Sequence, residues 1–209
     1  MTTNRHPIRD YSVIKNMIHQ NKYLYAKRTM DFLLSLVLLI PVVVLIIVLA
    51  VLIKKDSVGP VFYRGERIGK GMQKFTPLKL RTMRHNPYES SKYSTNENDD
   101  RITNVGRVLR KFRIDEIPQI CNVLIGEMSF IGPRPFVDYE YDNDIENFEV
   151  RTLVRPGISG LAQVRGGNDL SLEEKFEYDL KYLENLSFKE DLMIFVETIR
   201  VVVTGEGAR

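Results

Sequence analysis

Two adjacent acids, Asp115 and Glu116, are the residues of this sequence best suited to chemistry. They lie in the segment RKFRIDEIPQ, where Pro118 favours the first turn of a helix. Free backbone N–H groups and the helix dipole stabilise anions at such a position. A carboxylate kept ionised in this way could attack phosphorus as a nucleophile or bind a hard cation such as Mg²⁺. The alternative is that both acids only interact with the helix dipole.

Basic residues around this acidic pair could hold the phosphates of a substrate. Residues 101–113 contain five Lys or Arg and no acid, whereas residues 138–149 are rich in acids. The candidate phosphate contacts lie in a β-prone run, beside the acidic pair and in two Pro-containing turns: Lys79, Arg81, Arg110, Arg134 and Arg155. Each of them alone is typical of an ordinary surface charge, so these residues do not identify a reaction.

The composition narrows the class of protein. Thirty Lys and Arg against 27 Asp and Glu give a formal charge of +3, too close to balance to indicate a general nucleic-acid binder. Cys121 is the single cysteine, which excludes an intrachain disulfide, and the three His are too scattered for a zinc site. These features fit one globular unit in a reducing, cytosol-facing compartment.

Residues 32–53 form an uncharged apolar segment that is long enough to enter a membrane. About 20 residues are needed to cross the hydrocarbon core. A signal peptide fits poorly, because a Lys pair follows the segment where a cleavage site would be needed. Basic pairs at 27–28 and 54–55 favour the cytoplasmic side for both ends, and Pro41 would kink or break a helix near its middle. The two hypotheses are a re-entrant helix–break–helix and a kinked spanning helix.

The remaining sequence predicts a mainly α domain with a small β-hairpin. Two β-prone runs, 61–63 and 75–80, enclose a Gly-rich turn, and a capping box at Ser171 begins a helix that ends near residue 183. Two further helices are expected, one around residues 106–112 and another that ends near residue 124. The division is an N-terminal extension (1–26), a membrane anchor (27–55) and a cytosolic domain (56–209).

Two other segments leave alternatives open. Residues 86–100 are almost without apolar side chains and predict a loop, either a lid over a site or a solvated connection. A C-terminal stripe recurs at helical spacing: Leu192, Phe195, Val196, Ile199, Val202 and Val203. This stripe is either part of the core or an amphipathic surface in the membrane interface.

Several motifs occur in a characteristic order. They are KRTMD (27–31), the apolar run with Pro41, SVGPVFY (57–63), LKLRTM (78–83), GRVLRKFRIDEIPQICNVLIGEMSFIGPRP (106–135), VRPGISGLAQV (154–164) and LEEKFEYDLKYLENLSFKEDL (172–192). In this combination the chain resembles the bacterial sugar transferase family, the monotopic phosphoglycosyl transferases that act on polyprenyl phosphate. The resemblance covers essentially the whole chain after residue 26.

The resemblance implies an architecture and a location. The fold is a re-entrant membrane helix broken near Pro41, one cytosolic catalytic domain and interfacial amphipathic helices. The implied location is the cytoplasmic face of the bacterial inner membrane, where the enzyme would carry out the first membrane step of exopolysaccharide or capsule synthesis. The implied partners are a UDP-sugar, polyprenyl (undecaprenyl) phosphate and the lipid bilayer, with no nucleic acid; a homodimer is left open.

The same resemblance implies a two-step mechanism. Asp115 attacks the sugar-bearing phosphorus, UMP leaves, and polyprenyl phosphate then takes the sugar phosphate from the carboxylate. Mg²⁺ is the implied cofactor, with Asp115 at or near the metal, and Glu116 is either a further ligand or the base for the lipid acceptor. The implied phosphate contacts are Lys79, Arg81, Arg110 and Arg134.

Some positions depart from the family pattern. Leu80, Leu161 and Leu172 replace aromatic residues common in the family, and Gly167 stands where Arg is usual. The sugar is therefore not identified by resemblance. Two alternatives remain: a catalytically silent membrane adaptor for polysaccharide assembly, and an anion-binding module for nucleic acid or anionic lipid that uses residues 101–113. Steep salt dependence without Mg²⁺-dependent turnover would favour the anion-binding module.

Overall fold

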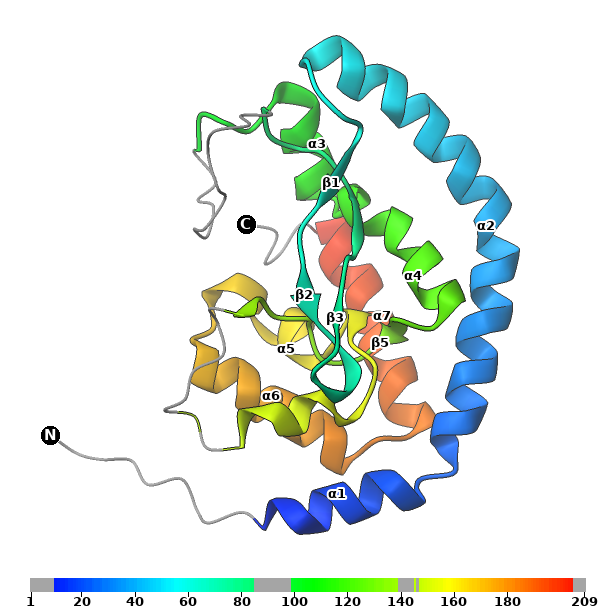
Figure 1. Ribbon diagram of the computed structural model, residues 1–209, viewed down its shortest axis with the longest axis vertical. Coiled ribbons are helices and arrows are strands. Elements are labelled where there is room, and N and C mark those ends of the chain that lie inside the picture. The colour runs from blue at the N-terminus through cyan, green and yellow to red at the C-terminus, as the bar shows by residue number, and fades with distance from the viewer. Residues whose placement is uncertain (1–9, 85–98, 139–144, 146, 205–209) are drawn as a thin grey trace, which may run out of the picture.

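The chain folds into a mainly helical domain bordered on one side by a single long helix (Figure 1). The computed structural model describes residues 10–84, 99–138, 145 and 147–204. The α-helices are α1 (Tyr11–Gln20), α2 (Tyr23–Asp56), α3 (Asn104–Lys111), α4 (Ile120–Ile125), α5 (Leu161–Arg165), α6 (Leu172–Glu184) and α7 (Phe188–Thr204). Short 3-10 helices are η1 (Lys70–Met72), η2 (Ile114–Gln119), η4 (Phe148–Leu153) and η5 (Gly167–Asp169). This confirms the mainly α class.

Three pairs of short strands complete the fold. Strands β1 (Phe62–Arg64) and β4 (Leu78–Leu80) are antiparallel, and β2 (Arg67–Ile68) pairs with β3 (Lys74–Phe75) farther along the same hairpin. The hairpin expected from the sequence is therefore confirmed, with η1 at its tip. Strands β5 (Ser129–Ile131) and β6 (Gly157–Ser159) are parallel. Gly157 is required there, because a Cβ at this position would lie 2.2 Å from the backbone nitrogen of Gly132.

Helix α2 continues through Pro41, so the helix break expected from the sequence is absent from the secondary structure. Pro41 removes one backbone donor, and the long helix is curved along its length instead of opening (Figure 1). The mean hydropathy of its most apolar 18-residue window is 3.7, and 17% of that window is buried inside the structure. The helix is thus long and apolar enough to cross a membrane. Its course relative to a bilayer stays a prediction.

The first turns of α2 are tied to the C-terminal part of the domain through buried polar groups. The Lys27 ammonium donates to a carboxylate oxygen of Asp191, at 2.5 Å, in the first turn of α7. The hydroxyl groups of Tyr23 and Tyr182 donate to the same carboxylate at 2.7 and 2.8 Å. A buried cation and anion that are paired and hydrogen-bonded in this way fix the angle between α2 and α7.

The main hydrophobic core lies between α1, α6, α7 and η4. Helix α1 contributes Ile14 and Ile18, so residues 11–20 of the N-terminal extension pack into the domain. Helix α6 begins with the predicted capping box, since Ser171 and Glu174 each accept a hydrogen bond from the other's backbone N–H. A second cluster joins the end of α2 to β4 and α3 through Ile53, Leu80 and Leu109.

The C-terminal stripe is exposed, so the core interpretation of it is wrong. Leu192, Phe195, Val196, Ile199 and Val203 are 46% to 75% exposed, and Val202 is half-buried. The inner face of α7 is formed instead by Asp191, Ile194 and Val201. Helix α7 has apolar side chains on two faces, and the sequence alone did not say which of them meets the core. The predicted loop at residues 86–100 lies outside the described residues except for its last two.

Candidate active site

The acidic pair lies in the first turn of η2, as the position of Pro118 predicts. The element is a 3-10 helix that continues into α4, and it packs against β4 of the hairpin. Arg113, just before η2, adopts a left-handed backbone conformation with φ of 54°. This conformation is uncommon for a residue with a side chain and turns the chain sharply from α3 into η2.

Glu116 is the fixed member of the pair. Its Oε1 accepts a hydrogen bond from Lys79 Nζ at 2.7 Å and from Arg134 Nη2 at 3.3 Å. Burial by itself would raise the pKa of Glu116, but Lys79 and Arg134 outweigh burial and hold this pKa well below its usual range. Glu116 is therefore an ionised carboxylate with a restricted orientation.

Asp115 is the available member of the pair. Burial and the charge of Glu116 raise the pKa of Asp115 to about 6, against the opposing effect of Lys79 and Arg110. Within the described part of the chain, its side chain has no ion pair and no side-chain hydrogen bond. The two neighbouring carboxylates therefore differ in their ion-pair partners and in proton affinity, as expected when adjacent acids have different tasks.

The donors present fit a Mg²⁺ ion that is shared with a substrate. Among the described residues, no group of three His, Cys, Asp or Glu side chains gathers into a site that could hold a metal without other ligands. Mg²⁺ commonly binds through one or two carboxylates together with phosphate oxygens and waters. Asp115 offers such a carboxylate, whereas Lys79 and Arg134 already occupy one oxygen of Glu116. Asp115 is thus the better candidate ligand.

Three of the five predicted phosphate contacts come together at this pair. Lys79 from β4 and Arg134 from the segment after β5 both contact Glu116. Arg110 from α3 acts electrostatically on Asp115. The guanidinium of Arg134 is 44% exposed, so it can meet a ligand while it holds Glu116.

Arg81 and Arg155 instead bond to the ends of helices. Arg81 is buried and donates to the carbonyl groups of Ser57 and Val58 at 2.8 Å each, just after α2. Arg155 donates through Nε to the carbonyl of Gly126 at 2.7 Å, at the end of α4. Cations stabilise the exposed carbonyl groups of helix C-termini, which accounts for both positions.

Arg113 is a member of the cluster that sequence reasoning did not select. It is half-buried and lies within electrostatic range of Asp115, Glu116 and Arg134. Its closeness in sequence to the acidic pair was a signal. The direction of its side chain, however, depends on the left-handed backbone at this residue.

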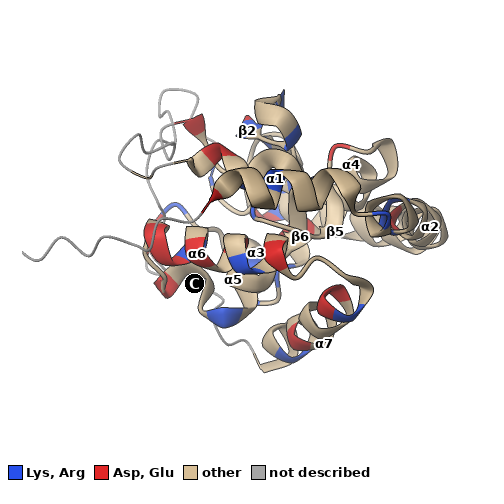
Figure 2. Cartoon of the chain, turned by 90° about the horizontal axis from the view of Figure 1, so that it is seen from below, with Lys and Arg blue, Asp and Glu red and all other residues tan. Residues whose placement is uncertain are grey.

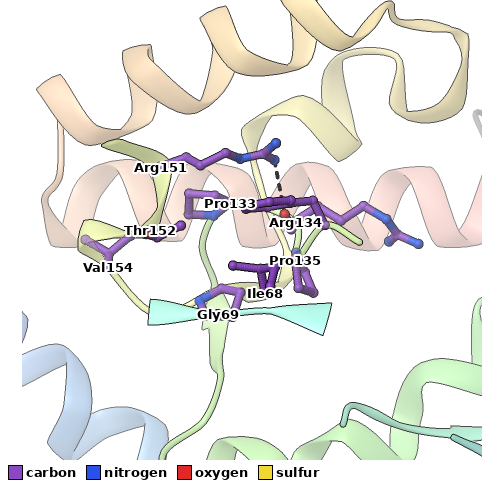
Figure 3. A pocket seen from close by; sticks show the side chains of 10 residues that line it. Ile68, Gly69, Pro133, Arg134, Pro135, Arg151, Thr152 and Val154 are labelled. Atoms are coloured by element: carbon purple, nitrogen blue, oxygen red, sulfur yellow. Dashed lines mark hydrogen bonds between the residues drawn. The ribbon is translucent and has the colours of Figure 1, made fainter. Parts of the chain in front are cut away.

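A small pocket lies behind the 133–135 turn and is not the site of the acidic pair (Figure 3). Its walls include Ile68, Thr152, Val154 and the prolines of the turn. Figure 3 shows the side chain of Arg134 pointing away from this pocket. The pocket therefore lies between the turn and the segments that pack against it, and not at the acidic pair.

Known proteins resemble this chain over most of its length. Residues 22–205 match the model of the family described as bacterial sugar transferase. The chain belongs to this family. Over 194 residues it is 43% identical to a UDP-N-acetylgalactosamine-undecaprenyl-phosphate N-acetylgalactosaminephosphotransferase of Aeromonas hydrophila, covering 90% of this chain and 46% of that protein.

Other members of the bacterial sugar transferase family differ in length. The exopolysaccharide production protein ExoY of Rhizobium meliloti is 38% identical over 200 residues, which is 88% of each chain. A UDP-glucose:undecaprenyl-phosphate glucose-1-phosphate transferase of Xanthomonas campestris is 37% identical over 192 residues, covering 87% of this chain and 40% of that protein. The chain thus spans less than half of the Aeromonas and Xanthomonas proteins.

Proposed function

We propose that this chain is a phosphoglycosyl transferase that moves a sugar 1-phosphate from a UDP-sugar to polyprenyl (undecaprenyl) phosphate and releases UMP. The observation that carries this proposal is the division of the acidic pair: Glu116 is held by two cations, and Asp115 beside it has no ion pair among the described residues. A carboxylate that is not held in an ion pair, with cations nearby that could bind phosphate, suits nucleophilic attack at phosphorus. The names of the Aeromonas and Xanthomonas relatives support the same class of reaction.

The proposed reaction has two displacements at one phosphorus atom. A carboxylate oxygen of Asp115 attacks the sugar-bearing phosphorus, the bond from that phosphorus to the bridging oxygen breaks, and UMP leaves with the electron pair. A phosphate oxygen of the polyprenyl carrier then attacks the same phosphorus and frees the Asp115 carboxylate. Lys79, Arg110 and Arg134 neutralise the charge that moves between the oxygens. Mg²⁺ held at Asp115 would neutralise the diphosphate of the donor.

Release of UMP tests the proposed function. With Mg²⁺ and polyprenyl phosphate present, we expect continuous UMP release from at least one member of a panel of UDP-sugars, and we expect a chelator to stop it. The assay also identifies the sugar. Failure of every UDP-sugar to release UMP, from protein confirmed as folded in membranes or detergent, would favour the adaptor alternative.

We propose that the chain enters the bilayer from the cytoplasmic face. The outer surface of α2 is apolar, residues 32–53 carry no charge, and Figure 2 shows this helix mostly in the tan of uncharged residues. The exposed stripe on α7 would lie in the membrane interface, because large apolar side chains exposed together are costly in water. Both ends of α2 carry basic pairs, which favours a continuous helix whose curvature brings both of its ends to the same side of the membrane.

Cysteine labelling tests this topology. In a Cys121→Ser background, we expect Tyr25→Cys and Val58→Cys, at positions 81% and 93% exposed, to react from the cytoplasmic side only. Adding Pro41→Leu should restore the missing backbone donor, straighten α2 and move part of the population to the spanning form. Val37→Leu, one turn earlier, is the matched control and should not change the labelling. Labelling of positions 25 and 58 from opposite sides without Pro41→Leu would contradict the re-entrant model.

A further inference from the structure

A buried ion pair lies next to the 133–135 turn. Arg151 of η4 and Asp179 of α6 approach to 2.6 Å, and their side chains are 5% and 1% exposed. Charges so far from water are costly to bury, and a well-packed apolar pair often stabilises a fold equally well. We therefore expect this ion pair to have a role other than stabilising the fold.

Arg151 also holds the backbone of the turn. Its Nη2 donates to the carbonyl of Arg134 at 3.1 Å, the interaction drawn as a dashed line in Figure 3. The guanidinium lies over the rings of Phe148 and Phe136, at 4.8 and 5.2 Å from their centroids. Asp179 and the two aromatic rings thus orient the guanidinium that bonds to Arg134.

The turn itself has little freedom apart from this contact. Proline on both sides of Arg134 restricts the backbone. Gly157 donates to the carbonyl of Pro133 at 2.9 Å, and Ile68 donates to the carbonyl of Phe136 at 2.8 Å. Arg151 binds the carbonyl between these two fixed points, so it determines how the peptide at Arg134 is oriented.

The side chain of Arg134 leaves the turn on the other side and reaches Glu116 at 3.3 Å. Four segments are therefore connected in series: α6 through Asp179, η4 through Arg151, the 133–135 turn through Arg134, and η2 through Glu116. We propose that Arg151 and Asp179 are positioning residues that fix the Arg134 guanidinium beside the acidic pair. This inference rests on the proposed function, in which Arg134 meets the donor phosphate.

Arg151→Lys separates positioning from folding. Nη2 makes both polar contacts, so a Lys keeps a charge that can pair with Asp179 but lacks the planar guanidinium that the two Phe rings hold in place against the Arg134 carbonyl. Because a displacement of about 1 Å at a reacting centre can cost up to about 100-fold, we expect kcat/KM to fall about 10- to 100-fold. Arg134→Lys should lower it similarly. The double variant should be no worse than the poorer single variant, since both changes act through one guanidinium.

A second measurement does not depend on catalysis. Hydrogen exchange of the peptide that contains residues 132–137 should accelerate in Arg151→Lys, while exchange in the α1 core stays slow. Asp179→Asn should act in the same direction if Arg151→Lys does not fold. Leu186→Ala, a core truncation in the segment between α6 and α7, is the control: it should lower Tm without faster local exchange and without loss of kcat/KM below Tm.

The outcomes of these experiments distinguish the positioning role of Arg151 and Asp179 from the proposed function of the chain. Multiplicative losses in the double variant, or unchanged exchange at 132–137, would overturn the positioning role of Arg151 and Asp179. A wild-type chain that releases no UMP, or Arg134→Lys with unchanged kinetics, would instead contradict the proposed function or the role of Arg134 in it. In that case faster exchange in Arg151→Lys would still support the pair as the device that fixes the turn.

Discussion

Replacing Asp115 by Asn should abolish both the covalent adduct and turnover while the protein stays folded. Asn keeps the size and shape of the side chain but removes the anion that attacks phosphorus. Removal of a nucleophile commonly costs on the order of 10³-fold or more in kcat, so only trace UMP release is expected. Wild-type enzyme with UDP-sugar and Mg²⁺ but no lipid acceptor should release up to about one UMP per site and then stop. Intact-mass analysis should find the phosphosugar on Asp115.

Two further variants sharpen this experiment. Asp138→Asn removes an exposed carboxylate that pairs with Lys74 on the surface, and it should keep the burst, the adduct and turnover. Glu116→Gln should impair turnover because it weakens the hold on Lys79 and Arg134. Full activity in Asp115→Asn would refute the assignment of the nucleophile. A wild-type chain with steady turnover but neither burst nor adduct would indicate direct attack by the lipid phosphate.

Lys79→Met should produce the second largest loss, about 10²- to 10³-fold in kcat/KM, the cost typical of removing one donor that stabilises developing charge. Lys79 forms the shorter ion pair with Glu116 and also lowers the pKa of Asp115. Met retains most of the length of the side chain, so packing beside η2 is largely kept. Lys74→Met is the matched control on the same hairpin, because Lys74 is half-exposed and pairs with Asp138 at the surface.

The pH dependence should change with this substitution in a defined direction. In the free wild-type enzyme, the pKa of Asp115 near 6 predicts that kcat/KM falls as the pH drops through about 6, where the nucleophile becomes protonated. Without Lys79, the pKa values of both carboxylates rise, so this acid limb moves to higher pH. An unchanged acid limb together with unchanged kcat/KM would exclude Lys79 from the site.

The free energy of unfolding should depend on pH through the ion pairs of Glu116. The pKa of Glu116 is depressed in the folded protein, so its ion pairs stabilise the fold above the ordinary value of 4.5 and lose this effect as pH falls through the folded pKa. The free energy of unfolding of Lys79→Met should therefore lie farthest below that of the wild type at neutral pH. The difference should shrink in acid.

Local patterns in the sequence were enough to place several elements. The hairpin, the capping box at Ser171, the apolar helix and the acidic pair in a first helical turn all depend on residues close together in the chain. The order of motifs also identified the family, which the match over residues 22–205 confirms. The local sequence left a kink and a break at Pro41 both open; the break that the resemblance implied is absent, because the hydrogen bonds around a single missing donor are enough to keep α2 continuous.

Only the tertiary structure decided which cations meet the acids. Lys79 and Arg134 lie 37 and 18 residues from Glu116 in the chain, yet both contact one of its oxygens. Arg81 and Arg155 were equally good candidates by sequence. Their guanidinium groups instead donate to backbone carbonyl groups near the ends of α2 and α4. Charge is a property of each residue, whereas its partner depends on how separate segments pack, which no local pattern encodes.

The same reason explains two features that the sequence did not reveal: the buried face of α7 and the ion pair between Arg151 and Asp179. The apolar side chains of α7 show helical spacing on either assignment, and only packing against α5, β5 and β6 determines which face is buried. Arg151 and Asp179 carry no motif of their own, since each is one charge among many until the fold brings them to 2.6 Å. The sequence by itself thus determined most of the elements and the place of the acidic pair in a first helical turn, and tertiary packing determined the partners that make Asp115 and Glu116 different.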